Sequence, residues 1–443
     1  MAESMVELSN RISRVPRFQF HGRVTRVVGL VVEAVGVEGA VGDLCRIHSG
    51  ARGESVAAEI VGFQGDHVLL MPLGSMEGVK PGAAVQRQSR SSGVPFGAGL
   101  LGRVLDGLGR PMDGLGPIAY TRMVPIAAEP PNPLTRRPIR DILATGVRSL
   151  DGFLTLGRGQ RMGIFAGSGV GKSTLLGMMA RRTSADVNVI ALLGERGREV
   201  RDFIEGSLGP EGLARSVVVV ATGDQPALVR ARGALVATAL AEAFRDEGKE
   251  VLLMVDSVTR VAMAWRELGL AVGEPPTTRG YPPSVFAQLP RLLERAGNGS
   301  RGGITGIYTV LVEGDDFNEP VADHVRSVVD GHVVLSRKLA SAGHYPAVDV
   351  LESTSRVRDQ IVDPEVIRAS NRLLELLAAF REKEDLIAVG AYEPGNDALL
   401  DRAVRFRDPL KQLLRQEVDD PGDVDDVFRR IVELDRAASG EGR

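Results

Sequence analysis

One stretch decides how this chain is interpreted: Ala166-Gly-Ser-Gly-Val-Gly-Lys172-Ser173. A β-type run, Arg161–Phe165, precedes it, and a helix-forming run, Ser173–Arg181, follows it. A glycine-rich loop between a strand and a helix lets consecutive backbone N–H groups point at one phosphate, and the positive end of the helix adds to the attraction. The stretch therefore predicts a P-loop that binds the phosphates of a nucleotide.

Two side chains of this loop carry further chemistry. Lys172 can reach the β- and γ-phosphates, and the Ser173 hydroxyl can bind Mg²⁺. The strict motif has glycine at position 166, where this chain has alanine; because alanine is small and the position is the exit of a strand, we expect Ala166 to be tolerated. The residues predicted to bind nucleotide are Gly167, Ser168, Gly169, Val170, Gly171, Lys172, Ser173 and Thr174.

A second apolar run supplies a candidate for the metal site. Val251–Val255 reads as a buried strand and ends in Asp256, where a Walker-B aspartate holds Mg²⁺. Many P-loop ATPases place the water-orienting glutamate directly after this aspartate, but here Ser257 follows. The carboxylate that hydrolysis needs must therefore come from another segment.

Glu195 is the candidate for that carboxylate. It follows the run Val187–Leu193, which is typical of the strand after the P-loop helix. Glu195 would lie beside the γ-phosphate if this strand neighbours the P-loop strand. The alternative is a solvent-facing glutamate at the end of a strand.

The pattern of the chain predicts three domains. Short β-type runs separated by glycines between Phe18 and Gln88 predict a small β-barrel. From about 140 to 355, β-type runs alternate with helical ones, which is typical of a mostly parallel α/β sheet flanked by helices. Asp363-Pro364 has the form of a helix start, and helical spacing follows it. The predicted domains are 1–92 (short helix and β-barrel), 93–360 (ATPase domain) and 361–443 (helical domain).

The N-terminus has a pattern of its own. Residues 3–14 have the spacing of a short amphipathic helix. This helix either packs on its own domain or forms a binding site for a partner protein. No basic region followed by an apolar core is present, so we expect no signal peptide. No apolar run approaches the roughly 18 residues needed to span a bilayer. We therefore expect a cytoplasmic protein that reaches a membrane only through partners.

Composition narrows the function. The net charge of −3 and the few aromatic residues in the predicted barrel give no support for a nucleic-acid partner. The single cysteine, Cys45, is interpreted as a packed core residue, and its isolation fits a reducing cytoplasm. The six histidines show no ligand spacing, so no metal other than Mg²⁺ is expected.

Further motifs connect the chain to a known family. Gly194–Val200, Asp256–Arg260, Gly280–Phe286 and Tyr345–Asp349 resemble segments of the ATPases of type III protein export, namely the flagellum-specific and injectisome ATPases. This family is similar to the catalytic subunits of rotary ATP synthases. The resemblance covers nearly the whole chain, and Gly157–Ala180 looks closest to the flagellar branch.

The resemblance implies a RecA-like core, a homohexameric ring and specific residue roles. Glu195 and Lys172 match catalytic residues, and Ser173 and Asp256 match the Mg²⁺ site. Tyr345 falls where a ring stacks on adenine. Arg356 falls where an arginine finger reaches the neighbouring subunit's nucleotide, a device that contributes about 10³–10⁵ in rate. Without the resemblance, Arg356 would be interpreted as a surface or structural arginine.

The resemblance also implies partners. Turnover would help to release chaperones and unfold export cargo at a secretion gate on the cytoplasmic face of the inner membrane. A stator-like regulator would bind the N-terminal region, and a coiled-coil stalk would enter the ring. The loop Tyr392–Asn396 is a candidate for the central channel or a plain inter-helix turn.

Three other functions share parts of this pattern. A catalytic subunit of a rotary ATP synthase would need a distinct partner subunit. An RNA-translocating termination factor should have a basic, aromatic-rich barrel, which this chain lacks. A regulatory subunit without turnover would not need the carboxylate of Glu195. The segment Asp316–Pro320 does not separate the flagellar from the injectisome branch, and the flagellar branch is favoured.

Overall fold

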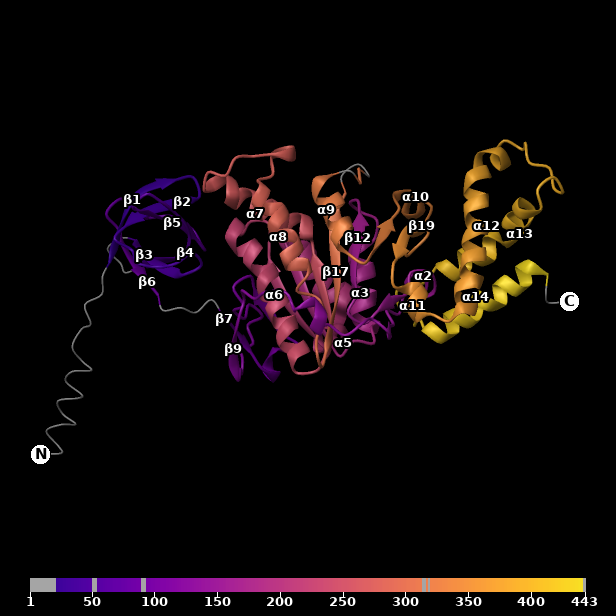
Figure 1. The fold of residues 1–443 in the computed structure, drawn as a ribbon, viewed down its shortest axis with the longest axis horizontal. Helices are drawn as coiled ribbons and strands as arrows, with labels where there is room; N and C mark the ends of the chain where they lie inside the picture. Colours follow the sequence, from indigo (N-terminus) through magenta and orange to yellow (C-terminus); the bar gives the residue numbers. More distant parts are fainter. Residues whose placement is uncertain (1–20, 50–53, 89–92, 313–315, 318, 441–443) are drawn as a thin grey trace, which may run out of the picture. The chain divides into compact units, whose positions relative to one another are not determined.

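The computed structural model describes residues 21–49, 54–88, 93–312, 316–317 and 319–440 (Figure 1). The helix expected at 3–14 lies outside these residues. The chain divides into two compact units, one of residues 1–92 and 271–273 and the other of the remaining residues. No helix that the structure describes is both long and apolar enough to cross a bilayer.

The first unit contains a closed β-barrel with antiparallel pairing in the order β1-β2-β5-β4-β3-β6 (Figure 1). Side chains alternate between its interior and its surface: Cys45 and Ile47 are buried, and Arg46 between them is exposed. Burial raises the pKa of the Cys45 thiol to about 11, and the Asp43 carboxylate adds to the rise. The predicted barrel and the core position of Cys45 are confirmed. The strands are β1 (Gly22–Val28), β2 (Val31–Val35), β3 (Leu44–Ser49), β4 (Glu54–Gln64), β5 (His67–Pro72) and β6 (Ala84–Arg87).

The second unit is built around one large sheet with the strand order β19-β18-β12-β17-β15-β13-β14-β8. The strands from β18 to β8 run parallel, whereas β19 pairs with β18 in the antiparallel direction. This confirms the predicted parallel α/β sheet. The strands are β8 (Val104–Asp106), β12 (Arg161–Ala166), β13 (Val187–Leu193), β14 (Ser216–Ala221), β15 (Glu250–Asp256), β17 (Gly303–Leu311), β18 (Gly331–Leu335) and β19 (Val348–Ser355), with β16 (Gly297–Asn298) paired to β17.

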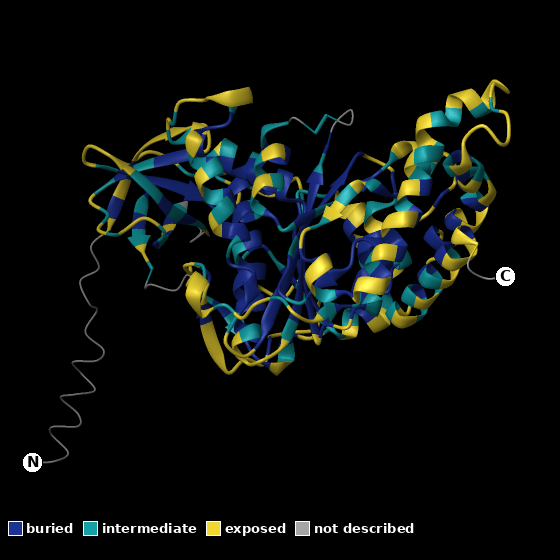
Figure 2. Ribbon diagram, turned by 45° about the vertical axis from the view of Figure 1, so that its right-hand side comes forward, coloured by how far each residue is buried: buried dark blue, intermediate teal, exposed yellow. Residues whose placement is uncertain are grey.

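Helices cover the sheet, and the central strands are buried along their whole length (Figure 2). Burial on both faces explains why these strands read as continuous apolar runs without alternation. The long helix α6 packs on β13, β14 and β15. The helices are α2 (Arg148–Phe153), α3 (Lys172–Arg182), α4 (Gly197–Asp202), the π-helix η3 (Phe203–Leu208), α5 (Gly209–Ala214), α6 (Ala227–Asp246), α7 (Val258–Ala271), α8 (Pro283–Leu293), α9 (Pro320–Val328), α10 (Arg337–Ser341) and α11 (Arg358–Ile361).

Several short elements complete the second unit. Two small antiparallel pairs, β7 with β9 and β10 with β11, are formed here. The elements are β7 (Gly93–Phe96), η1 (Ala98–Leu100), β9 (Arg122–Pro125), η2 (Pro133–Thr135), β10 (Ile142–Leu143), β11 (Leu156–Gly157) and η4 (Thr278–Gly280).

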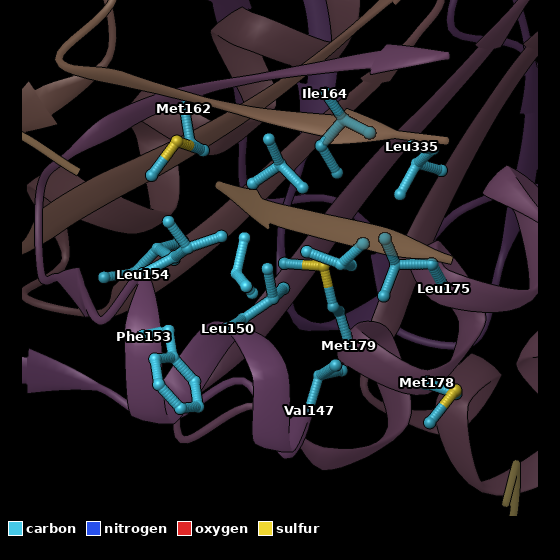
Figure 3. Close-up of a cluster of buried hydrophobic side chains, with 14 of the residues drawn as sticks. Val147, Leu150, Phe153, Leu154, Met162, Ile164, Leu175, Met178, Met179 and Leu335 are labelled. Carbon is cyan, nitrogen blue, oxygen red and sulfur yellow. The ribbon is translucent and has the colours of Figure 1, made fainter. Parts of the chain in front are cut away.

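Three helices, α12 (Pro364–Ala388), α13 (Ala398–Leu414) and α14 (Val424–Ser439), form the C-terminal part of the chain. The Asp363 side chain accepts a hydrogen bond from the Glu365 N–H, and Pro364 is the first helical residue, as predicted. These helices share one hydrophobic cluster with the sheet, into which α2 inserts Leu150 and Phe153 (Figure 3). The segment Tyr392–Asn396 is a turn between α12 and α13.

Candidate functional site

The P-loop lies between β12 and α3, as the sequence predicts. Gly169 and Gly171 have φ angles of 78° and 88°, which residues with a Cβ atom rarely adopt. Ala166 is instead the last residue of β12, paired with Leu311 and Leu335 on the two neighbouring strands. Its extended backbone and buried position accept a methyl group, which explains why alanine replaces glycine there.

The loop presents its polar residues outward. Ser168, Gly169, Ser173 and Thr174 are at least partly exposed, whereas Val170 is buried in the core and Gly167 is buried at the strand exit. The buried Val170 fixes the loop to the protein, and the N-terminus of the 11-residue helix α3 opens beside the accessible residues. This arrangement suits an anion with several oxygens.

Lys172 lies between two carboxylates. Its Nζ forms an ion pair with Asp256 and lies 3.7 Å from an oxygen of Glu195. Asp256 is the last residue of β15 and is 2% exposed. The Thr309 hydroxyl on β17 donates a 2.7 Å hydrogen bond to the same Asp256 oxygen. Three residues predicted from separate motifs therefore meet, and Thr309, which no motif indicated, orients one of them.

The condition set for Glu195, that its strand neighbours the P-loop strand, is not met, yet its side chain lies close to Lys172. Strand β13 does not neighbour β12, because β15 and β17 lie between them. Three strand spacings separate the two strands by about 14 Å. Glu195 reaches Lys172 because the lysine and the loop after β13 both extend over the carboxyl ends of the intervening strands. The solvent-facing alternative is excluded, since the Glu195 side chain is only 17% exposed.

The environment of Glu195 changes its acidity. Burial raises the pKa of the Glu195 carboxyl to about 7, and the positive charge of Lys172 opposes this rise. The charge of Asp256 and a hydrogen bond with Glu199 raise the pKa further. The pKa of Glu195 is therefore close to neutral pH, the range in which a general base is most effective.

A small cavity joins the metal-site candidates to Glu195. Its volume of about 20 Å³ is enough for a single water molecule. Ser173 and Asp256 supply a hydroxyl and a carboxylate to it, which are the oxygen ligands that Mg²⁺ prefers. Glu199, four residues after Glu195, also lines the cavity, although no sequence motif indicated it. The lining residues are Ser173, Leu192, Glu195, Glu199, Val200, Phe203 and Asp256.

Tyr345 lies beside the P-loop. A Cβ atom on Gly171 would lie 3.4 Å from the Tyr345 ring, so the ring faces the loop at Gly171 with no room for a larger side chain between them. The Tyr345 side chain is 46% exposed, which leaves part of the ring free to stack on a base. The Gln416 N–H, from the segment between α13 and α14, donates a 3.0 Å hydrogen bond to the Tyr345 carbonyl.

Arg356 does not join the site of its own chain. It directly follows β19, whose Ser355 pairs with Gly331 at the beginning of β18. Strand β18 runs parallel to β12, so Arg356 lies near the start of β12 and the P-loop lies at its end. Six residues of strand separate these two ends by about 20 Å. The Arg356 residue is exposed at the far end of the sheet.

Comparison with known proteins agrees with this geometry. Residues 146–355 match the nucleotide-binding domain of the ATP synthase alpha/beta family, 24–88 its beta-barrel domain, and 362–433 the T3SS EscN ATPase C-terminal domain. The chain is 52% identical to the flagellum-specific ATP synthase of Bacillus subtilis (strain 168), over 96% of this chain and 97% of that protein. The chain belongs to the family of flagellar and type III secretion ATPases.

This family of export ATPases includes relatives from both branches. The chain is 53% identical to the type 3 secretion system ATPase of Xanthomonas euvesicatoria, over 90% of each chain. The structure of the assembled ATPase EscN from the enteropathogenic E. coli type III secretion system matches with a TM-score of 0.88 and 42% identity, covering 94% of this chain and all of that one. EscN in complex with its central stalk EscO matches with a TM-score of 0.87. The chain is thus an ATPase of flagellar and type III secretion export, with the barrel, α/β core and helical C-terminal part of that family.

Proposed function

We propose that this ATPase works as a homohexameric ring that hydrolyses Mg²⁺-ATP at its subunit interfaces and energises protein export through a flagellar apparatus. The observation that carries the proposal is the meeting of Lys172, Asp256 and Glu195 beside the P-loop, with Arg356 at the opposite end of the sheet. A single chain has every part of the site except the finger. A second copy, offering its own Arg356, would complete it.

Binding begins with an exchange of partners at Lys172. The ammonium is held by Asp256 and lies near Glu195. The γ-phosphate of ATP carries more negative charge than one carboxylate, so Lys172 would turn to it together with the amides of the loop. Tyr345 would then stack on adenine, and the proximity of its ring to Gly171 supports this role.

The residues that would hold Mg²⁺ are Ser173 and Asp256, which line one cavity. The bound ion would neutralise charge that develops on the β- and γ-phosphates. Once Lys172 binds phosphate, the Asp256 carboxylate is available, and Thr309 keeps it oriented. A hydroxyl and a carboxylate on one cavity are the minimum that the protein must supply, since Mg²⁺ takes its other ligands from phosphate and water.

Glu195 would orient the attacking water. Its carboxylate shares the cavity that has room for one water molecule, and its pKa of about 7 allows it to accept a hydrogen bond or a proton near neutral pH. The guanidinium of the neighbouring subunit's Arg356 would stabilise charge on the transferring phosphoryl group. One subunit would thus supply the binding residues and the water-orienting carboxylate, and the next would supply the arginine that stabilises the transition state.

The assembly and partners follow from the relatives. EscN has been solved as an assembled ATPase and with a central stalk, EscO, and this chain matches both over 94% of its length. We extend this to a ring with a coiled-coil stalk in its centre, close to the turn Tyr392–Asn396. We also extend the family's role to contacts of the N-terminal region with a stator-like regulator, release of chaperones and unfolding of cargo. The ring would be cytoplasmic and recruited by its partners to the inner membrane.

The decisive experiment measures ATPase activity per subunit against protein concentration, with Glu195→Gln and Arg356→Ala alongside. Activity should rise as subunits associate, require Mg²⁺, and fall by about 10³-fold or more in both variants. Restored motility of a bacterium that lacks its flagellum-specific ATPase would support the flagellar branch. Flat, negligible activity at every concentration would instead indicate a chain that needs a different subunit.

A further inference from the structure

The backbone that carries Arg356 is anchored on both sides of the residue. The Arg356 N–H donates a 3.0 Å hydrogen bond to the Asp330 carbonyl. Val357 and Arg358, which follow it, are 9% and 7% exposed. The exposed Arg356 side chain is therefore attached to a buried, hydrogen-bonded segment of backbone. The inference drawn from this buried segment rests on the proposed function, in which Arg356 acts in the neighbouring subunit's site.

Gln160 binds the residue before Arg356. Its Nε2 donates a 3.0 Å hydrogen bond to the Ser355 hydroxyl and a 3.4 Å one to the Asp330 carbonyl, and its Oε1 accepts a 2.9 Å bond from the Gly157 N–H. The Ser355 hydroxyl in turn donates a 2.9 Å bond to the Thr155 carbonyl. Gln160 is 0% exposed. A buried amide with this many partners has one orientation, so it holds Ser355 in one place.

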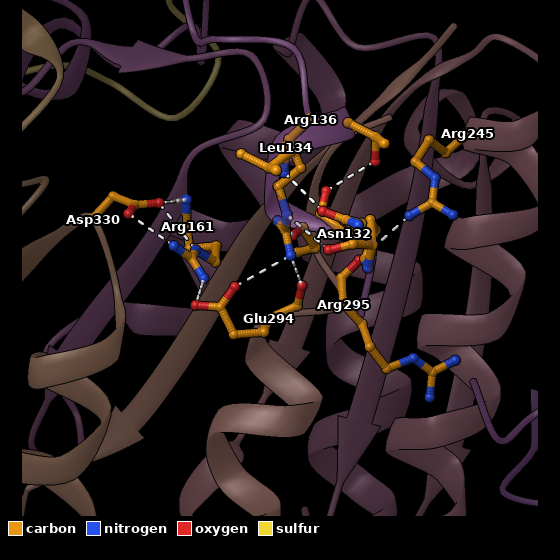
Figure 4. Close-up of polar contacts among 11 residues, drawn as sticks. Asn132, Leu134, Arg136, Arg161, Arg245, Glu294, Arg295 and Asp330 are labelled. Carbon is orange, nitrogen blue, oxygen red and sulfur yellow. Dashed lines mark hydrogen bonds and ion pairs between the residues drawn. The ribbon is translucent and has the colours of Figure 1, made fainter. Parts of the chain in front are cut away.

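Asp330 ties the same point to the start of the P-loop strand. Its carboxylate accepts two parallel hydrogen bonds from the Arg161 guanidinium, at 3.1 and 3.0 Å, and a third from the Arg161 N–H at 3.0 Å (Figure 4). Arg161 also forms an ion pair with Glu294 (Figure 4). A bidentate pair of this kind fixes distance and direction together. Asp330 is thus held rigidly while its carbonyl holds Arg356.

We propose that Gln160 and Asp330 are positioning residues that aim Arg356 at the nucleotide of the neighbouring subunit. Gln160 directly precedes β12, the strand that ends in the chain's own P-loop, and Asp330 directly precedes the neighbouring parallel strand β18. A misplacement of about 1 Å can cost roughly 10²-fold in rate. Because the arginine side chain is long and flexible, its backbone must be held in a fixed position. The hydrogen bonds among Gln160, Ser355 and Asp330 hold the backbone at Arg356 in place.

The test uses mixed rings in which one subunit type lacks the catalytic carboxylate. Gln160→Leu keeps the side-chain size and removes the amide, and Ser355→Ala is the milder variant that removes the same contact. Each should lower kcat about 10- to 100-fold with KM for ATP unchanged, because its own P-loop is intact. Mixing either variant with inactive Glu195→Gln subunits should restore activity, since the latter donate correctly placed arginines. The neighbour Thr354→Ala is the matched control and should have the activity of the unmodified chain.

Each outcome separates the inference from the proposed function. Rescue of Arg356→Ala by Glu195→Gln, measured in parallel, must succeed if the finger acts between subunits; its failure overturns the proposed function. If that rescue succeeds, the inference is overturned by wild-type kcat in both Gln160→Leu and Ser355→Ala. It is equally overturned if their lost activity is not recovered in mixed rings, because damage to a subunit's own site cannot be repaired by its neighbour.

Discussion

The Thr309 hydroxyl lies 2.7 Å from the Asp256 carboxylate and donates a hydrogen bond to it from the adjacent strand of the sheet. Both residues are buried, at 0% and 2% exposure. The same Asp256 oxygen therefore has both a neutral donor and the Lys172 ammonium as partners. Under the proposed function, this donor would keep the carboxylate oriented once Lys172 binds a phosphate.

The first prediction concerns this hydrogen bond. Thr309→Val keeps the shape of the side chain and removes the donor, so kcat/KM for ATP should fall about 10- to 100-fold, the value of one hydrogen bond to a charged group. Steady-state kinetics at saturating Mg²⁺ measure it. Thr305→Val, the same change on the same strand but at a hydroxyl that accepts from the Gly159 N–H, should leave kcat/KM unchanged. Equal losses in both variants would show that the substitutions disturb strand β17, and that the loss does not come from the hydrogen bond to Asp256.

A second prediction concerns pH. The raised pKa of Glu195, about 7, means that its carboxylate is present above this pH and lost below it. Because water orientation needs the charged form, kcat/KM should fall as the pH drops through 7. Glu199→Gln removes a negative charge that raises this pKa and supplies an amide donor that favours the ionised Glu195 carboxylate, so the acid limb should move to lower pH.

A matched control for the pH experiment lies nearby. Glu205→Gln removes the same charge from an exposed side chain that pairs with Arg201, and the profile should not move. A profile of Glu199→Gln that coincides with that of the unmodified chain would contradict the assigned coupling.

Tyr345 yields a third prediction. Tyr345→Ala should raise KM for ATP roughly tenfold with little change in kcat, because base stacking on an aromatic ring contributes about 1–3 kcal/mol and the phosphate contacts remain. Tyr345→Phe, which keeps the ring, is the control and should retain the KM. A fall in kcat alone would place Tyr345 outside the base site.

The fourth prediction concerns the fold. Arg295 and Glu242 form a buried pair with hydrogen bonds of 2.9 and 2.6 Å, and Arg295 also donates to the Ile126 carbonyl. Glu242→Leu leaves the Arg295 charge buried without its partner and should lower the free energy of unfolding by about 3–5 kcal/mol. Chemical denaturation measures it. Breaking the exposed pair with Glu205→Ala should cost only about 0–1 kcal/mol, and an equal loss in the two variants would refute the assigned burial cost.

Local sequence patterns determined much of this protein. The glycines at 169 and 171 indicated a loop that curls around a phosphate, and both have the left-handed backbone that such a loop needs. The barrel, the parallel sheet and the helix start at Asp363 also followed from spacing and composition, because each depends on residues close together in the chain. The helix expected at 3–14 stays a prediction, as do the roles assigned to the site residues.

Tertiary structure decided what local patterns could not. Strand order placed β15 and β17 between β12 and β13, which no periodicity encodes, because strands of similar apolar sequence can be exchanged in the order of a sheet without changing their pattern. The same order brought Thr309 to Asp256. It also put Arg356 at the other end of the sheet from its own P-loop. Short-range sequence specifies which groups are present, whereas long-range packing determines which of them meet.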